Sequence, residues 1–261
     1  MNRLSHLTFA FSLFVALYSL IFAFSVWQSD LGQLTEFLLY YIVGGIAFMI
    51  IVTPLLYWKA PNKDSASRTV TNRGAAFAVA YVVFAIGSLA GSIIYLWYHG
   101  IPFIGHVSLF IGAFITMSGA LMPDWDIIFL GISEHRHVVF HSVILPLLIT
   151  LLTLVNVANA IISTTSFSIG AHVEYYLAAL FLLGYASHLY LDIFPSDASP
   201  LEILWRVVDP SDKAPTGLKP WGPITISKKA AKSWLVGNAS LLVMVAVGLM
   251  ALYFYNLQLA P

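Results

Sequence analysis

Seven long apolar runs constrain this chain more than any other feature of its sequence. Most of them reach the roughly 17 to 25 residues that a helix needs to cross the hydrocarbon core of a bilayer. Of the 261 residues, 59% are hydrophobic and 9% are charged, whereas soluble domains carry roughly a quarter of charged residues. The sequence therefore predicts an all-α, polytopic helical membrane protein with about seven transmembrane helices. The runs are Leu7–Trp27, Phe37–Trp58, Ala75–Tyr98, Ile101–Met122, Val139–Val157, Tyr175–Phe194 and Trp234–Tyr255.

The basic residues predict which helix ends face the cytoplasm. Short loops rich in Lys and Arg stay on the cytoplasmic side. If the N-terminus is cytoplasmic, all 12 basic residues lie at Arg3 or in the inner loops 59–74, 123–138 and 195–233. We therefore expect a cytoplasmic N-terminus and an integral plasma (inner) membrane location. The first apolar run is long and has no small-residue cleavage site, so we expect a retained helix rather than a signal peptide.

The predicted organisation is one integral membrane domain, residues 1–261. Helices in residues 1–98 precede a core, residues 101–210, which carries the polar motifs described below, and a last helix follows at 234–256. The 195–233 segment holds six of the 12 prolines and cannot form one long helix, so we expect a cytoplasmic loop. Within it, Leu201–Val208 is expected to form a short interfacial helix.

Composition excludes several kinds of site. The chain has no cysteine, so disulfides, thiolate metal sites and cysteine nucleophiles are absent. Any metal site must be built from His, carboxylate and carbonyl groups. The formal net charge is zero and no glycine-rich phosphate loop is present, so nothing here predicts nucleic-acid binding.

Three segments hold nearly all of the unusual polar residues. They read LMPDWD (121–126), EHRHVVFHS (134–142) and GYASHLYLD (184–192), and the predicted topology places all three at cytoplasmic helix ends. His188 and Asp192 are spaced i, i+4 and share one helix face. If the 134–142 segment is helical, His137 and His141 share a face in the same way. We therefore expect the three segments to meet at one depth.

Ionisable side chains at this depth favour a metal site. An Asp at the centre of a membrane helix costs roughly 2.5 to 3.5 kcal/mol on insertion scales. A divalent metal would balance carboxylates gathered among neutral imidazoles; Zn²⁺, Mn²⁺ or Fe²⁺ suits such a mixture, and Mg²⁺ suits a carboxylate-dominated site, with one or two ions bound. Each residue alone also has a structural reading, such as helix capping by Asp124 or a solvated loop His137. Taken together, the predicted ligands are Asp124, Asp126, His141, His188 and Asp192.

At these residues the sequence resembles the YdjM-like family of inner-membrane proteins, which are predicted to be metal-dependent hydrolases. That family has a PDxD segment, then HRGxTHS, then a GYxxHxxxD helix. The counterparts here are PDWD (123–126), HRHVVFHS (135–142) and GYASHLYLD (184–192), and the match covers roughly residues 101–210. By position, the resemblance implicates Asp124, Asp126, His135, His141, His188 and Asp192.

The chain also departs from that family pattern. His137 stands where the family usually has Gly, and Phe140 stands where it usually has Thr. The family tends to have an early Thr-His, for which GHVSLF (105–110) is the nearest equivalent. The predicted topology puts His106 on the far side of the membrane from Asp124 and His6 on the same side, and we leave both outside the expected site.

The leading hypothesis is a membrane-embedded, metal-dependent hydrolase that acts at the cytoplasmic interface. Its expected substrate is a phosphoester or head group of a lipid-like amphiphile, with the bilayer as the other partner. His135 would donate a proton or add a ligand, and Arg136 would hold an anionic oxygen bidentately. One alternative is an ion-coupled transporter that uses the same Asp/His cluster. Another is a haem-binding or assembly protein with His141 and His188 as axial ligands.

Overall fold

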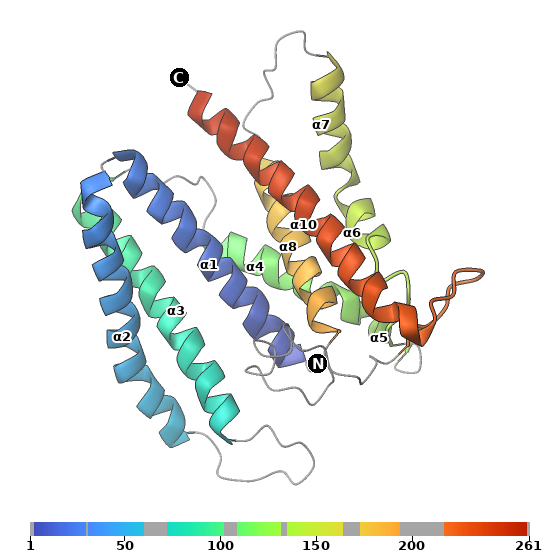
Figure 1. The fold of residues 1–261 in the computed structure, drawn as a ribbon, viewed down its shortest axis with the longest axis horizontal. Coiled ribbons are helices and arrows are strands. Elements are labelled where there is room, and N and C mark those ends of the chain that lie inside the picture. The colour runs from blue at the N-terminus through green and yellow to red at the C-terminus, as the bar shows by residue number, and fades with distance from the viewer. Residues whose placement is uncertain are drawn as a thin grey trace. The chain divides into compact units, whose positions relative to one another are not determined.

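The computed structural model describes residues 3–29, 31–59, 72–101, 109–131, 135–163, 173–193 and 217–259. Over these ranges the chain is helical, with isolated bridges and no strand (Figure 1). The all-α prediction is therefore confirmed for the described residues. The expected helix Leu201–Val208 and His106 lie outside them.

The helices follow the apolar runs of the sequence. Four helical stretches are long and apolar enough to cross a membrane, and this is compatible with a membrane protein. They are His6–Ala23, Leu34–Leu55, Leu109–Leu130 and Lys228–Phe254. The helices are α1 (Arg3–Ser29), α2 (Leu34–Lys59), α3 (Asn72–Tyr98), α4 (Leu109–Leu121), α5 (Trp125–Leu130), α6 (Ile144–Ile149), α7 (Leu151–Ser163), α8 (Val173–Leu191) and α10 (Lys228–Leu259), with short 3₁₀ turns η1 (Leu31–Gln33) and η2 (Met122–Asp124).

The run Val139–Val157 does not form the single helix that we expected. Residues 139–143 form turns, and α6 begins only at Ile144, so that Pro146 lies in the first helical turn. Proline is tolerated there because the N–H that it lacks has no partner in the first turn of a helix. A further turn at Thr150 separates α6 from α7, and the Thr150 hydroxyl donates to the Pro146 carbonyl oxygen at 2.8 Å.

The chain divides into two compact units, and the prediction of one integral membrane domain stays a prediction. One unit comprises Phe11–His106 and Asp197–Pro210. In it α2 and α3 lie side by side, because the backbones meet at Gly44 and Gly91; a Cβ built on Gly44 would lie 2.9 Å from the Gly91 Cα. Tyr95 packs edge-on against Phe37 in the same helix pair, with ring centroids 5.6 Å apart.

The other unit comprises Met1–Ala10, Val107–Ser196 and Ser211–Pro261. Its core is α8, which is buried along most of its length and packs against α4 and α10. A Cβ on Gly119 would overlap the Phe181 carbonyl, and a Cβ on Gly184 would overlap the Thr116 carbonyl. Only glycine fits at these two positions, so the backbones of α4 and α8 touch. This close contact places the end of α4 next to the polar end of α8.

Candidate metal centre

Three carboxylates and four imidazoles, with one guanidinium, form a connected network inside the unit built around α8. They come from separate parts of the chain: the first turns of α1, the η2–α5 corner, the 135–141 segment and the end of α8. All except His135 are buried. The members are His6, Asp124, Asp126, His135, Arg136, His141, His188 and Asp192.

Asp192 is the centre of this network. Its Oδ1 lies 3.5 Å from His6 Nε2 and 3.3 Å from Arg136 Nη2. Its Oδ2 lies 3.1 Å from His141 Nε2 and 3.6 Å from His188 Nε2. One carboxylate therefore faces the Nε2 atoms of three imidazoles and a guanidinium, which is a strong concentration of nitrogen groups around one buried anion.

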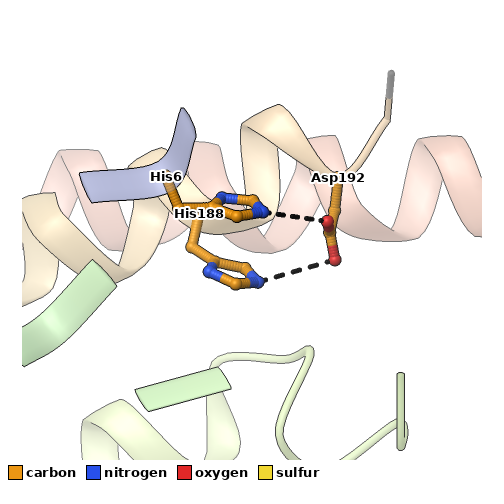
Figure 2. A group of neighbouring side chains, drawn as sticks. All are labelled: His6, His188 and Asp192. Atoms are coloured by element: carbon orange, nitrogen blue, oxygen red, sulfur yellow. Dashed lines mark ion pairs between the residues drawn. The ribbon is translucent and has the colours of Figure 1, made fainter. Parts of the chain in front are cut away.

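Figure 2 shows His6 and His188 stacked, with each ring directed to a different oxygen of Asp192. The ring centroids are 3.7 Å apart and the ring planes differ by 10°. Two imidazolium cations stacked so closely would repel each other, so at least one of the pair is neutral. Ligand atoms of these three buried residues all lie within 4.8 Å of one another, which fits a metal ion.

The tautomer of His188 follows from its surroundings. Its Nδ1 lies 2.6 Å from the Ala120 carbonyl oxygen. A carbonyl oxygen only accepts hydrogen bonds, so Nδ1 carries the hydrogen and donates it. The buried Nε2 has no hydrogen-bond partner among the described residues. The carboxylate oxygens near it are those of Asp192, at 3.6 Å, and Asp124, at 3.8 Å.

His141 has the same arrangement. Its Nδ1 lies 3.3 Å from the His137 carbonyl oxygen, and its buried Nε2 faces Asp192. With Nδ1 donating, an Nε2 lone pair would point at carboxylate lone pairs and be repelled by them, so the contact needs a proton on Nε2 or a metal ion shared by the two groups. Histidines that bind metals commonly fix the second nitrogen on a carbonyl or carboxylate in this way. The buried group of His6, His188 and Asp192 could therefore hold a metal ion, and His141 Nε2 lies 3.1 Å from the same carboxylate.

Asp126 forms the outer side of the network. One oxygen lies 3.2 Å from His135 Nδ1, and the other accepts the backbone N–H of His137 at 3.0 Å. The side chain of His135 is 36% exposed, so it links the buried carboxylates to the surface. The hydrogen bond to Asp126 raises the pKa of His135 above its ordinary value of 6.5, although burial opposes the shift.

The fixed charges of the network do not cancel. Three carboxylates and one guanidinium leave two negative charges when every imidazole is neutral. Burying uncompensated charge is costly. A single divalent cation would restore neutrality without protonating any imidazole, so the charge balance also fits one bound ion.

The backbone of the 135–141 segment is held in an unusual conformation. Arg136 has φ 67°, and it is the one residue other than glycine with positive φ in the described ranges. Such a conformation is strained for a bulky side chain and often lies at functional sites. Lys219 holds the segment by backbone hydrogen bonds, from its N–H to the Arg136 carbonyl and from the Val138 N–H to its own carbonyl, both 2.9 Å long. This geometry directs the Arg136 guanidinium to Asp192.

The structure brings the predicted residues together and adds one that the motifs do not contain. The five expected ligands and both expected catalytic residues belong to the network. The added residue is His6, which the motifs do not include and whose only signal in the sequence is its predicted depth in the membrane. The ring of His137 packs edge-on against Phe140, at a centroid distance of 6.2 Å, and its backbone N–H donates a hydrogen bond to Asp126.

Comparison with family models, curated proteins and solved structures finds no match to this chain. The resemblance to the YdjM-like family therefore rests on the three motifs and stays a prediction.

Proposed function

We propose that this protein is a membrane-embedded, metal-dependent hydrolase related to the YdjM-like family. In this proposal the chain crosses the inner membrane seven times, with its N-terminus in the cytoplasm. It hydrolyses a phosphoester or other head-group bond of a lipid-like substrate at the cytoplasmic interface. The observation that carries the proposal is the pair His141 and His188, whose Nε2 atoms face the buried carboxylate of Asp192.

The proposed ligands of the ion are His6, His141, His188 and Asp192, with Asp124 beside them. A divalent ion bound there supplies Lewis-acid activation of water and of the scissile group. The number of imidazoles favours Zn²⁺, Mn²⁺ or Fe²⁺ over Mg²⁺, which prefers oxygen ligands. Asp126 contacts His135 and His141, and it belongs to the proposed site as a ligand or as the carboxylate that orients them.

His135 is the proposed proton donor to the leaving group. It is the half-exposed imidazole of the network, and its pairing with Asp126 favours the protonated form. A general acid must be protonated and within reach of the leaving atom. The pairing with Asp126 supports the first need, and the partly exposed position of His135 supports the second. Arg136 Nη2 donates to the Asp192 carboxylate, and the guanidinium is proposed to contact an anionic substrate oxygen at the same place.

An amphiphilic substrate is supported by the surface beside the network. The short helix α5 has Asp126 on its buried side, whereas Ile128 and Phe129 are exposed by 68% and 66%. An apolar surface next to a polar site suits a molecule with an apolar tail and a polar head. The lipid bilayer is the proposed partner of this surface.

An ion-coupled carrier is the second candidate, but the position of Asp192 supports an enzyme. Intramembrane carrier sites lie near the bilayer midplane, where helices are interrupted. Asp192 follows Leu191, the last residue of α8, so this carboxylate is at a helix end. Asp124 lies in η2, which interrupts the apolar stretch Leu109–Leu130, and this is the feature that favours a carrier.

Elemental analysis of the detergent-purified protein tests the metal site. Wild type is expected to retain stoichiometric metal, and the double variant Asp124→Asn/His188→Ala is expected to lose it. His99→Ala is the matched control, because His99 pairs with Glu36 in the other unit, at 3.4 Å. Metal-loaded wild type is then assayed on phosphoester lipids beside Asp192→Ala. Equal turnover by Asp192→Ala, or no metal in wild type after incubation with Zn²⁺ and Mn²⁺, would overturn the proposal.

A further inference from the structure

Helix α10 lies outside the three motifs, yet it contacts the backbone at His141 and, two residues further on, at Val143. The indole N–H of Trp234 donates to the His141 carbonyl oxygen at 3.1 Å. The side-chain oxygen of Asn238 accepts the Val143 N–H at 2.8 Å. Trp234 and Asn238 are spaced i, i+4 on α10, and the Asn238 amide also donates to the Trp234 carbonyl at 2.7 Å.

These contacts matter because the His141 segment has no regular secondary structure. Residues 138–143 form turns and bends, in which the Val138 N–H bonds to Lys219 and the His141 N–H bonds to the His137 carbonyl. Among the described residues, no helix or sheet ladder is recorded for the carbonyls of Phe140 and His141. Backbone groups in such a segment need partners from elsewhere. Tyr185 on α8 supplies one, donating its hydroxyl to the Phe140 carbonyl, and Trp234 supplies the next. The direction of His141 Nε2 depends on the backbone between these contacts.

We propose that Trp234 and Asn238 are positioning residues of the metal centre. They hold the backbone at His141 so that its Nε2 reaches the ion that His188 and Asp192 also bind. This proposal rests on the proposed metal site. It assigns a role to α10, which none of the sequence motifs includes.

A purely structural role for the two residues makes a different prediction. If their hydrogen bonds only stabilise the fold, removing one lowers the unfolding temperature but leaves the bound metal unchanged. If they position His141, removal alters the metal site in folded protein. Loss of a group that orients a ligand commonly weakens metal binding by about 10-fold to 100-fold.

The test uses Co²⁺ as the probe, because its visible bands report the ligands around it. Purified, metal-depleted wild type, Trp234→Phe and Asn238→Leu are titrated with Co²⁺ and followed by absorbance. Trp234→Phe keeps the aromatic ring and removes only the N–H. Trp221→Phe is the matched control, because Trp221 is 54% exposed and the hydrogen bonds recorded for it are made by its backbone.

The expected result is unchanged stoichiometry, a Kd weaker on the order of 10-fold, and shifted visible bands in both α10 variants. The Trp221→Phe control should match wild type. Wild-type Kd and spectrum in both α10 variants would overturn the positioning role while leaving the metal site intact. No Co²⁺ binding by wild type, or equal binding by wild type and His188→Ala, would overturn the metal site itself. If Trp234→Phe does not fold, Asn238→Leu decides the question.

Discussion

The Nδ1 atom of His188 lies 2.6 Å from the backbone carbonyl oxygen of Ala120. The contact joins α8 to the last turn of α4, and it exists because Gly119 and Gly184 let the two backbones touch. The tautomer of the imidazole, and with it the lone pair available on Nε2, is therefore set by helix packing. The metal centre should respond to changes that push these helices apart.

Gly184→Ala is expected to destabilise the protein and weaken metal binding. The new Cβ would overlap the Thr116 carbonyl, and overpacking of this kind typically costs about 1–3 kcal/mol. Separating the helices also moves the Ala120 carbonyl away from His188. Gly237→Ala on α10 is the control, because beyond the backbone of its own helix a Cβ there would meet no described atom within 4 Å. Thermal unfolding in detergent and metal titration check the result; wild-type metal affinity in Gly184→Ala would contradict it.

His6→Ala is expected to weaken metal binding by on the order of 10-fold or more, since a ligand matters at least as much as a group that orients one. The residue is buried beside Asp192 and stacks on His188. His99→Ala removes an imidazole from the other unit and should leave the affinity unchanged. Calorimetric titration of both variants with Zn²⁺ measures the effect. Equal affinities would remove His6 from the site.

Arg136→Gln is expected to destabilise metal-free protein more than metal-loaded protein. The guanidinium lies 3.3 Å from Asp192, and losing a buried hydrogen bond to a charged group costs about 1–3 kcal/mol. A bound divalent ion supplies positive charge at the same carboxylate and offsets the loss. Unfolding temperatures of variant and wild type, each with and without metal, give the comparison. An equal shift in both states would show that Arg136 does not share the role of the ion.

In metal-free protein the pKa of His135 is expected to lie above 6.5 and to fall in Asp126→Asn. The charged imidazole is stabilised by Asp126 only in the folded state. The stability from this pair is therefore fully present below the unfolded pKa of 6.5 and is lost as pH rises through the higher folded pKa. Titration of ¹⁵N-labelled histidine by NMR reports both values, and the pH dependence of the unfolding temperature gives the second check. An unchanged His135 pKa in Asp126→Asn would contradict the assignment.

Most of the network could be predicted from the sequence, because many of its residues are closely spaced within one of the three motifs. The i, i+4 pair His188 and Asp192 forms within one helical stretch, and it lies together in the structure as expected. The other motif residues sit at neighbouring helix ends, so a topology based on apolar runs and basic loops was enough to bring them together. The count of seven spans and their orientation stay predictions.

Other parts of the network depend on tertiary contacts that spacing does not encode. His6 comes from a helix start with no motif around it. Arg136 adopts positive φ because neighbouring segments hold it there, and no residue preference predicts this for Arg. The expected helix over 139–157 failed at its first residues because Pro146 favours the first turn of a helix. In the sequence, Trp234 has no signal beyond that of an interfacial aromatic. Its role follows from the hydrogen bond that its N–H donates to the His141 carbonyl.

The position of His6 in the first turns of α1 decides where an affinity tag can be placed. A polyhistidine tag fused ahead of Arg3 would bring competing imidazoles within a few residues of the metal centre. Such a tag would compete for the ion or for the carboxylates, and elemental analysis would then measure metal bound to the tag. The end of α10 is the safer place. This helix has 32 residues at about 1.5 Å each, and Trp234, its contact with the site, lies near the opposite end.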